Sequence, residues 1–232
     1  MNTTFVPEFL PSAREIRDIF ADEIGSLGGI VSDEVNVGQH LFLRAVLAAD
    51  AEVRPGDTVR SGVALRASGP EIVVHPYTFR YVCSNGAIAA HALQSRRLER
   101  IEHTEVFVPS FEAAVSLEHL RETIRSCGSA QTFATVSNEM RTASETEADV
   151  AIQLLPSISR LAPEIVQQVL PQILQRFGSA GDRSAFGLMN AVTSVARDTE
   201  DPDTRWKLEV LGGTVPGRVV SQNPLNVAAG VF

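Results

Sequence analysis

The sequence predicts an α+β protein in which an antiparallel β meander follows an N-terminal helix and precedes a C-terminal helical subdomain. Three observations predict this fold. The chain opens with a helix-capping pattern, residues 40–83 alternate with a period of two, and residues from 110 onward return to helical spacing. A run of strands followed by a run of helices is typical of the α+β class.

The first helix is expected to begin at Ser12-Ala13-Arg14-Glu15, where serine and glutamate stand at the spacing of a capping box. The apolar residues that follow recur every three or four positions and so share one face: Ile16, Ile19, Phe20 and Ile24.

Three strands are expected next, over residues 40–47, 58–67 and 71–83. Pro55-Gly56-Asp57 and Ser68-Gly69-Pro70 provide the turns between them, and Pro76 is expected to bend the third strand. The alternation gives the sheet one packed face and one partly basic face.

The later part of the chain is expected to be helical, over residues 110–127, 133–155, 163–177, 184–197 and 204–211. The 232 residues are enough for a single domain, with a sheet-containing part at 1–109 and a helical part at 110–211. Residues 212–232 are rich in glycine, proline and asparagine, which favours an extended or disordered tail.

Composition excludes several classes of protein. Two cysteines are too few for a secreted disulfide scaffold. The N-terminus lacks the basic start and long apolar core of a signal peptide, and the apolar runs are too short to span a bilayer. We therefore expect a cytoplasmic protein without a membrane partner.

Charge is distributed unevenly along the chain. The net charge is −8, but residues 40–100 hold eight arginines against five acidic residues, a local balance of +3. This contrast predicts a basic face that contacts phosphates. The expected nucleic-acid-binding residues are Arg60, Arg66, Arg80, Arg96, Arg97 and Arg100. The alternative is that the arginines simply keep the sheet soluble.

An aromatic stripe follows the third strand, where His75, Tyr77, Phe79 and Tyr81 share one face. Such a stripe either fills the core beneath helices or forms a stacking platform for single-stranded bases. Arg80 points away from Phe79 and Tyr81 in a regular strand, which weakens the second interpretation.

Cys83 is a weak candidate nucleophile, with His75 or His91 as its base. The favoured interpretation is a small buried hydrophobe, because no known Cys/His pattern is present. Histidines and cysteines do not stand at metal-ligand spacing, and no phosphate-binding loop occurs. No metal and no cofactor are expected.

Two polar groups have structural and functional interpretations. Asn85-Gly86 is expected to form a tight turn, and with Ser84 it would otherwise present a binding edge. Asn190 and Thr193 lie one helical turn apart and are expected to pin their helix to the sheet. The alternative is a pocket that they line together with Asp182 and Arg183.

Three segments stand in the order and spacing of a known family. They are Gly56-Asp57 with Ser61-Gly62-Val63-Ala64-Leu65, the strand 73–80 running into Tyr81-Val82-Cys83-Ser84-Asn85-Gly86, and Gly187-Leu188-Met189-Asn190-Ala191-Val192-Thr193. On these segments the chain resembles the phage/plasmid-like protein family, domain of unknown function 932. The resemblance implies a role in mobile-element biology and implies no reaction.

The favoured function is a non-enzymatic protein that binds DNA or RNA through the basic part of the sheet. The first alternative is a protein-interaction module, such as a defence inhibitor or a self-assembling homo-oligomer, whose acidic segments at 139–149 and 198–203 meet a basic partner. The second is a hydrolase or transferase that depends on Cys83.

Overall fold

The computed structural model describes residues 11–69, 71–81, 85–90, 96–99 and 109–222, and it confirms the α+β class. The helices are α1 (Ala13–Ser26), α2 (Pro109–Cys127), α3 (Ala130–Glu145), α4 (Val150–Gln153), α5 (Leu155–Ile158), α6 (Pro163–Ser179), α7 (Ala185–Arg197) and α8 (Pro202–Gln222). The strands are β1 (Ile30–Val37), β2 (His40–Arg54), β3 (Asp57–Ser68), β4 (Glu71–Arg80), β5 (Asn85–Ile88) and β6 (Arg96–Glu99).

Helix α1 begins with the predicted capping box. The Glu15 amide donates to Ser12 Oγ over 3.2 Å, and the Ser12 amide donates to the Glu15 carboxylate over 2.7 Å. The buried side chains that follow are the predicted apolar face. They pack with the β2–β4 side chains Leu43, Val63 and Val74 in one core cluster.

The sheet is an antiparallel meander in the order β1-β2-β3-β4-β5. β6 also pairs with β4, along Glu71–Val74, whereas β5 pairs with Tyr77–Arg80. Pro76 stands between these two stretches, where the neighbouring strand changes, and the register with β3 continues across it. Pro76 is paired with neither β5 nor β6, so no ladder hydrogen bond is lost through its missing backbone N–H. Proline can therefore stand inside this strand.

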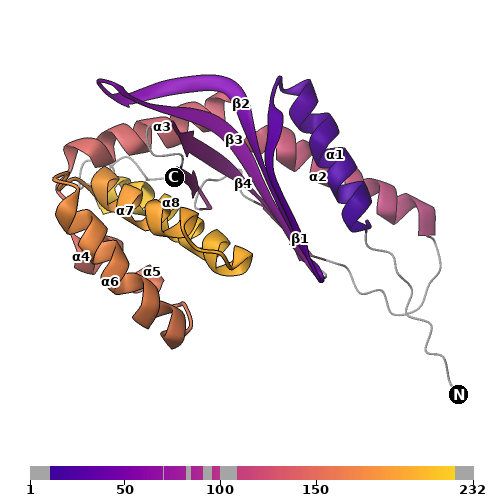
Figure 1. Cartoon of the computed structure of the whole chain (residues 1–232). Helices are drawn as coiled ribbons and strands as arrows, with labels where there is room; N and C mark the ends of the chain where they lie inside the picture. The colour runs from indigo at the N-terminus through magenta and orange to yellow at the C-terminus, as the bar shows by residue number, and fades with distance from the viewer. Residues whose placement is uncertain (1–10, 70, 82–84, 91–95, 100–108, 223–232) are drawn as a thin grey trace, which may run out of the picture.

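Helices cover both faces of the sheet (Figure 1). α1 and α2 pack on one face. On the other face Trp206 of α8 packs with Phe42, Ala64 and Tyr77. The largest cluster joins α3, α7 and α8 to the sheet through Val53, Val59, Ala87 and Ala89.

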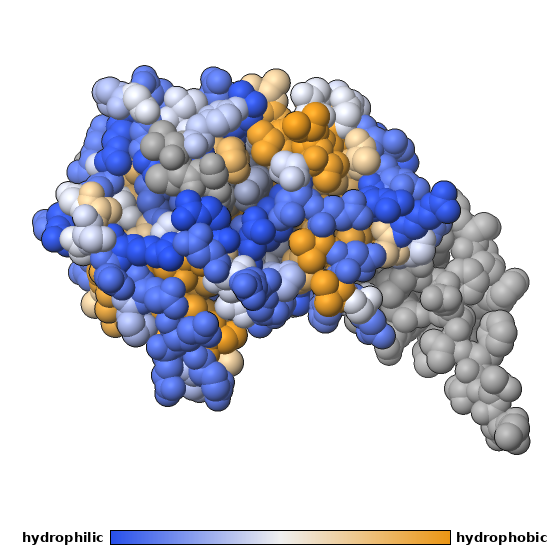
Figure 2. Space-filling view, in the orientation of Figure 1, coloured by the Kyte–Doolittle hydropathy of each residue, from blue (hydrophilic) through white to orange (hydrophobic). Residues whose placement is uncertain are grey.

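β1 forms one edge of the sheet and was not predicted as a strand. Its side chains are mostly exposed, with Ile30 at 71% and Val37 at 55% of full exposure. A strand exposed on both faces has no apolar alternation for a sequence pattern to detect. Figure 2, in the orientation of Figure 1, shows hydrophobic patches where β1 lies, separated by a hydrophilic band.

The expectation of an extended tail from residue 212 is wrong as far as residue 222. α8 continues through Gly212 and Gly213 to Gln222, and Val215 and Val219 are buried in the helical core. Gly213 lies against the backbone of Ile88, where an added Cβ would stand 2.1 Å from the carbonyl oxygen. Gly213 allows the helix to pack this closely against Ile88, and it does not end the helix. Residues 223–232 lie outside the described part.

One predicted long helix is divided. The helix expected over 133–155 ends at Glu145, and two short helices, α4 and α5, follow it. Thr146 is extended at this end, and Glu147 forms a β-bridge with Ser184. The bridge ties the segment to the start of α7, which a continuous helix would not allow.

Candidate nucleic-acid interface

Arg80 forms a two-pronged ion pair with Asp57. Its Nε and one terminal nitrogen each lie 2.6 Å from a different carboxylate oxygen, and both side chains are largely buried. The pairing of Val59 with Arg80 brings the first residue of β3 beside the end of β4. The guanidinium also lies 5.7 Å from the Phe186 ring of α7. Arg80 therefore joins the sheet to the helical core.

Arg66 is also engaged by acidic residues. Its guanidinium lies 3.2 Å from Asp203 at the start of α8 and 3.7 Å from Glu71. Of the expected phosphate-binding arginines, Arg96 and Arg97 lie in β6, where only the backbone is described, and Arg100 lies outside the described residues.

Arg60 occupies a different environment. It stands directly across from Phe79 in the β3–β4 register, so both side chains lie on one face. Its guanidinium carbon lies 4.6 Å from the centre of the Tyr81 ring, within cation–π range. It forms no ion pair with any residue in the described part of the chain.

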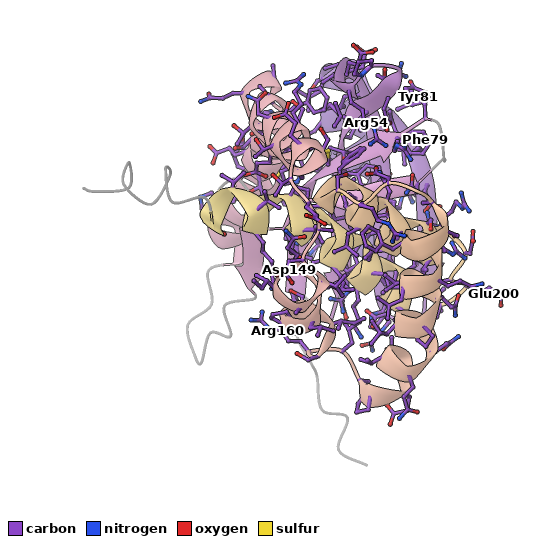
Figure 3. All side chains as sticks on the ribbon, turned by 90° about the vertical axis from the view of Figure 1, so that its left-hand side faces the viewer. Arg54, Phe79, Tyr81, Asp149, Arg160 and Glu200 are labelled. Carbon is purple, nitrogen blue, oxygen red and sulfur yellow. The ribbon has the colours of Figure 1, made fainter. Side chains whose placement is uncertain are left out.

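Phe79 and Tyr81 complete a small aromatic surface with Arg60. The two rings meet edge to face, with centroids 5.7 Å apart and an angle of 84°. Tyr81 is 44% exposed, whereas Tyr77 on the same stripe is buried in the core. The stripe therefore divides into a core part and a surface part, and Figure 3 shows Phe79 and Tyr81 close together at the surface. We call Arg60, Phe79 and Tyr81 the aromatic platform.

Arg80 was expected to lie on the opposite face of the sheet from Phe79 and Tyr81, and it does. Arg80 points to the face that packs on Phe186, while Phe79 points to the other face. The neighbouring strand β3 supplies the cation through Arg60. Arg60 was among the arginines expected to contact phosphates, but its position beside Tyr81 depends on the register between β3 and β4, which decides which side chains meet across the sheet.

Asp182 and Arg54 form a second charged contact beside the buried Asp57. Arg54 lies 2.8 Å from Asp182 and 3.3 Å from Asp57. Burial alone would raise the pKa of Asp182, but hydrogen bonds from Ser184 and the charge of Arg54 outweigh it and lower the pKa. The positive charge of Arg54 is therefore matched by the carboxylates of Asp182 and Asp57.

Asn85 and Gly86 do not form the predicted turn or an exposed binding edge. Both are buried in β5, paired with Arg80 and Phe79. A Cβ on Gly86 would stand 2.0 Å from the Tyr77 hydroxyl, so glycine is required by contact with that ring. Ser84 lies outside the described residues.

Asn85 connects the sheet to α7. Its Nδ2 donates to Thr193 Oγ1 over 2.5 Å, and Thr193 Oγ1 in turn donates to the Met189 carbonyl over 3.1 Å. The carbonyl of Asn190 lies 3.5 Å from the same Nδ2. Thr193 thus pins the helix to the sheet through its side chain, as predicted, whereas Asn190 contributes its backbone carbonyl and not its side chain. Arg183 lies apart from them, over the Phe177 ring at 5.8 Å.

The candidate catalytic cysteine lies outside the described residues, as does His91. His75 is half-buried, and its ring centre lies 6.0 Å from that of Trp206. Among the described residues, no group of three or more acidic, histidine or cysteine side chains is arranged to hold a metal ion. No helix in the described part of the chain is both long and apolar enough to cross a membrane.

Comparisons with protein-family models, curated proteins and solved structures find no significant match to this chain. The three segments that carry the family resemblance nevertheless meet in space. Asp57 of the first binds Arg80 of the second, and Asn85 of the second binds Thr193 of the third. The first contact joins β3 to β4, and the second joins β5 to α7.

Proposed function

We propose that the protein binds single-stranded nucleic acid by stacking bases on the aromatic platform. One observation carries the proposal: Tyr81 is 44% exposed, its ring centre lies 4.6 Å from the Arg60 guanidinium carbon, and the Phe79 ring lies nearly perpendicular to it at 5.7 Å. An exposed aromatic ring that is already fixed in position loses little entropy when a base stacks on it.

Stacking suits single strands because every base offers a flat π-face, and each stacked base contributes about 1–3 kcal/mol. Arg60 adds a cation beside the ring that can approach a phosphate. The resemblance to phage/plasmid-like proteins supports a role of this kind in mobile elements.

The proposed mechanism uses fewer arginines than the six that were expected to contact phosphates. Arg66 and Arg80 are engaged by acidic partners, and releasing Arg80 would deprive the buried Asp57 carboxylate of its two-pronged partner. We therefore expect a small footprint and a shallow dependence of affinity on salt, with about one phosphate contact from Arg60.

The test is fluorescence anisotropy with a labelled single-stranded oligonucleotide at low salt. Tyr81→Ala should weaken binding by roughly 5- to 150-fold, the equivalent of one stacked base. Tyr81→Phe keeps the ring and should retain most of the affinity. Arg14→Ala is the matched charge control, because Arg14 is exposed on α1.

Two results would contradict the proposal. One is the absence of binding by the unaltered chain to any single strand. The other is unchanged affinity in Tyr81→Ala, which would place the contact elsewhere. Equal binding of double-stranded DNA would also count against stacking, since paired bases do not expose their faces.

A second function, docking of another polypeptide, is favoured by β1. This edge strand exposes Ile30, Val31 and Val37, and exposed apolar edge strands pair with added strands. Self-association is the first case to measure, by light scattering during gel filtration. The double variant Ile30→Lys with Val37→Lys should abolish any oligomer; a strictly monomeric native chain at high concentration would exclude self-pairing.

A further inference from the structure

A groove of about 320 Å³ lies between the sheet and the C-terminal helices, apart from the aromatic platform. β3 and β4 contribute Arg66, Val73 and His75, and α8 contributes Trp206 and Lys207. The segment after α5 contributes Arg160 and Leu161. Figure 3 shows Arg160 well separated from Phe79 and Tyr81.

The walls of the groove are largely apolar. Val73 and Trp206 are buried side chains whose edges line it, and Leu161 and Val210 face them from the helices. Trp206 is fixed from behind, because its ring packs 6.0 Å from Phe42 and the Arg44 guanidinium lies 5.9 Å from its centre. A groove with apolar walls and a fixed aromatic side chain suits a flat organic ligand.

Among the residues that the structure describes, the charges at the mouth of the groove leave one cation unmatched. Asp203 binds both Arg66, at 3.2 Å, and Lys207, at 2.5 Å. Glu71 lies 3.7 Å from Arg66. Arg160 is exposed, and its side chain forms no ion pair or hydrogen bond with any described residue.

The segment that carries Arg160 is held in place by α8. Arg218 donates to the carbonyl oxygens of Ile152 and Gln153 over 3.1 and 3.3 Å, and it also donates to the Ser157 hydroxyl. The guanidinium of Arg160 therefore extends from a fixed base, three residues beyond Ser157.

We propose that this groove binds a nucleotide phosphate monoester, with the base against Trp206 and Leu161 and the phosphate on Arg160. Guanidinium groups match phosphate oxygens in geometry and charge, and a base fits between apolar walls. The same chemistry is present in a free nucleoside monophosphate and in the phosphorylated end of a nucleic-acid strand. The inference does not depend on the function proposed for the aromatic platform.

The chain contains a single tryptophan, so its fluorescence reports on this groove directly. The full-length protein would be titrated with deoxyadenosine monophosphate, and separately with deoxyadenosine and with inorganic phosphate. We expect a saturable change in Trp206 emission with the nucleotide, and binding about tenfold weaker or worse for either fragment alone.

Variants of Arg160 test its contribution to nucleotide binding in the groove. Arg160→Ala should weaken the nucleotide about tenfold, the usual loss for one charge-assisted contact. Arg160→Lys should recover part of the affinity, and Arg14→Ala should change nothing. Circular dichroism of each variant establishes that the fold is retained, as expected for an exposed side chain.

Two further ligands distinguish the sources of the phosphate. Oligonucleotides with a 5′-phosphate and with a 5′-hydroxyl are compared with the free nucleotide in the same titration. Preference for the 5′-phosphorylated strand assigns the groove to a strand end, and preference for the mononucleotide assigns it to a free ligand. No saturable response to any phosphate monoester, or an equal response in Arg160→Ala, overturns the proposal.

Discussion

Asn85 links the sheet to α7 through one side-chain amide. Its Nδ2 lies within reach of Thr193 Oγ1 and the Asn190 carbonyl, and the whole side chain is buried. A buried donor that loses its acceptor costs more than the bond itself contributes. Asn85 therefore has a structural role that its place in an Asn-Gly dipeptide does not reveal.

Asn85→Ala should lower the free energy of unfolding by about 1–3 kcal/mol, because Thr193 loses its donor partner inside the protein. Urea denaturation measures this loss. Asn138→Ala is the matched control, since Asn138 is exposed on α3 and alanine favours the helix. A double-mutant cycle with Thr193→Val should show coupling between the two sites. If the losses are simply additive, the hydrogen bond does not connect them.

Helices α1 and α2 are joined by a buried carboxylate. Glu23 of α1 lies 2.7 Å from Arg121 and 2.6 Å from Arg125, both on α2. Burial alone would raise the pKa of Glu23, but the hydrogen bonds and charges of Arg125 and Arg121 outweigh burial and lower it. The folded state therefore favours the ionised form.

A carboxylate with a lowered pKa stabilises the fold above its unfolded pKa, and this stability is lost as pH falls through the folded value. Glu23→Gln should lower Tm at neutral pH by a few degrees. The difference from the unaltered chain should narrow below the ordinary glutamate pKa of 4.5. Thermal melts across this range measure it. A gap that stays constant or widens in acid would show that ionisation of Glu23 is not the cause.

α8 approaches β5 so closely that one position admits only glycine. Gly213→Ala would place a methyl group 2.1 Å from the Ile88 carbonyl oxygen, so the helix must shift. We expect a loss of about 1–3 kcal/mol in the free energy of unfolding. Gly178→Ala is the control, because nothing lies within 4 Å of that Cβ in α6. It should be neutral or stabilise the helix by up to ~1 kcal/mol.

The meander and α1 were predictable because their signals are local. Apolar alternation and the capping box depend on neighbours a few residues apart. β1 and the second half of α8 were not predictable in this way. β1 has exposed side chains and therefore little pattern, and Gly212-Gly213 resembles a helix end until Ile88 is seen beside it.

The candidate site was predictable only in part. The sequence identified the aromatic stripe and the arginines as the relevant residue types. It could not show that Asp57 and Asp203 neutralise Arg80 and Arg66, because these acids are brought in by strand pairing and by α8. Tyr81 is exposed whereas Tyr77 on the same stripe is buried, and no local pattern encodes that difference.

The sheet and the helical part share one core at the scale of the whole molecule. Val53 and Val59 of the sheet are buried in the same cluster as Met140 of α3 and Leu208 of α8. Arg44 of β2 is fully buried and binds Glu209 of α8 over 2.8 Å. Separating the two parts would break this ion pair and expose the apolar side chains of the shared core to water, which is strongly unfavourable.

Unfolding should therefore be a single cooperative transition. Trp206 emission reports on the contact between α8 and the sheet, and far-ultraviolet circular dichroism reports mainly on the helices. We expect the two probes to give the same midpoint in urea. A helical signal that persists after Trp206 becomes exposed to water would instead indicate two independently stable parts.

The pairing of Arg44 with Glu209 spans 165 positions of the chain. During translation the arginine leaves the ribosome long before its carboxylate partner is made. Until α8 is synthesised, the nascent sheet holds a guanidinium and the Phe42 ring without their final cover. The face of the sheet that α8 closes thus stays open on the nascent chain until α8 is made, and premature termination before residue 209 would leave its apolar surface exposed permanently.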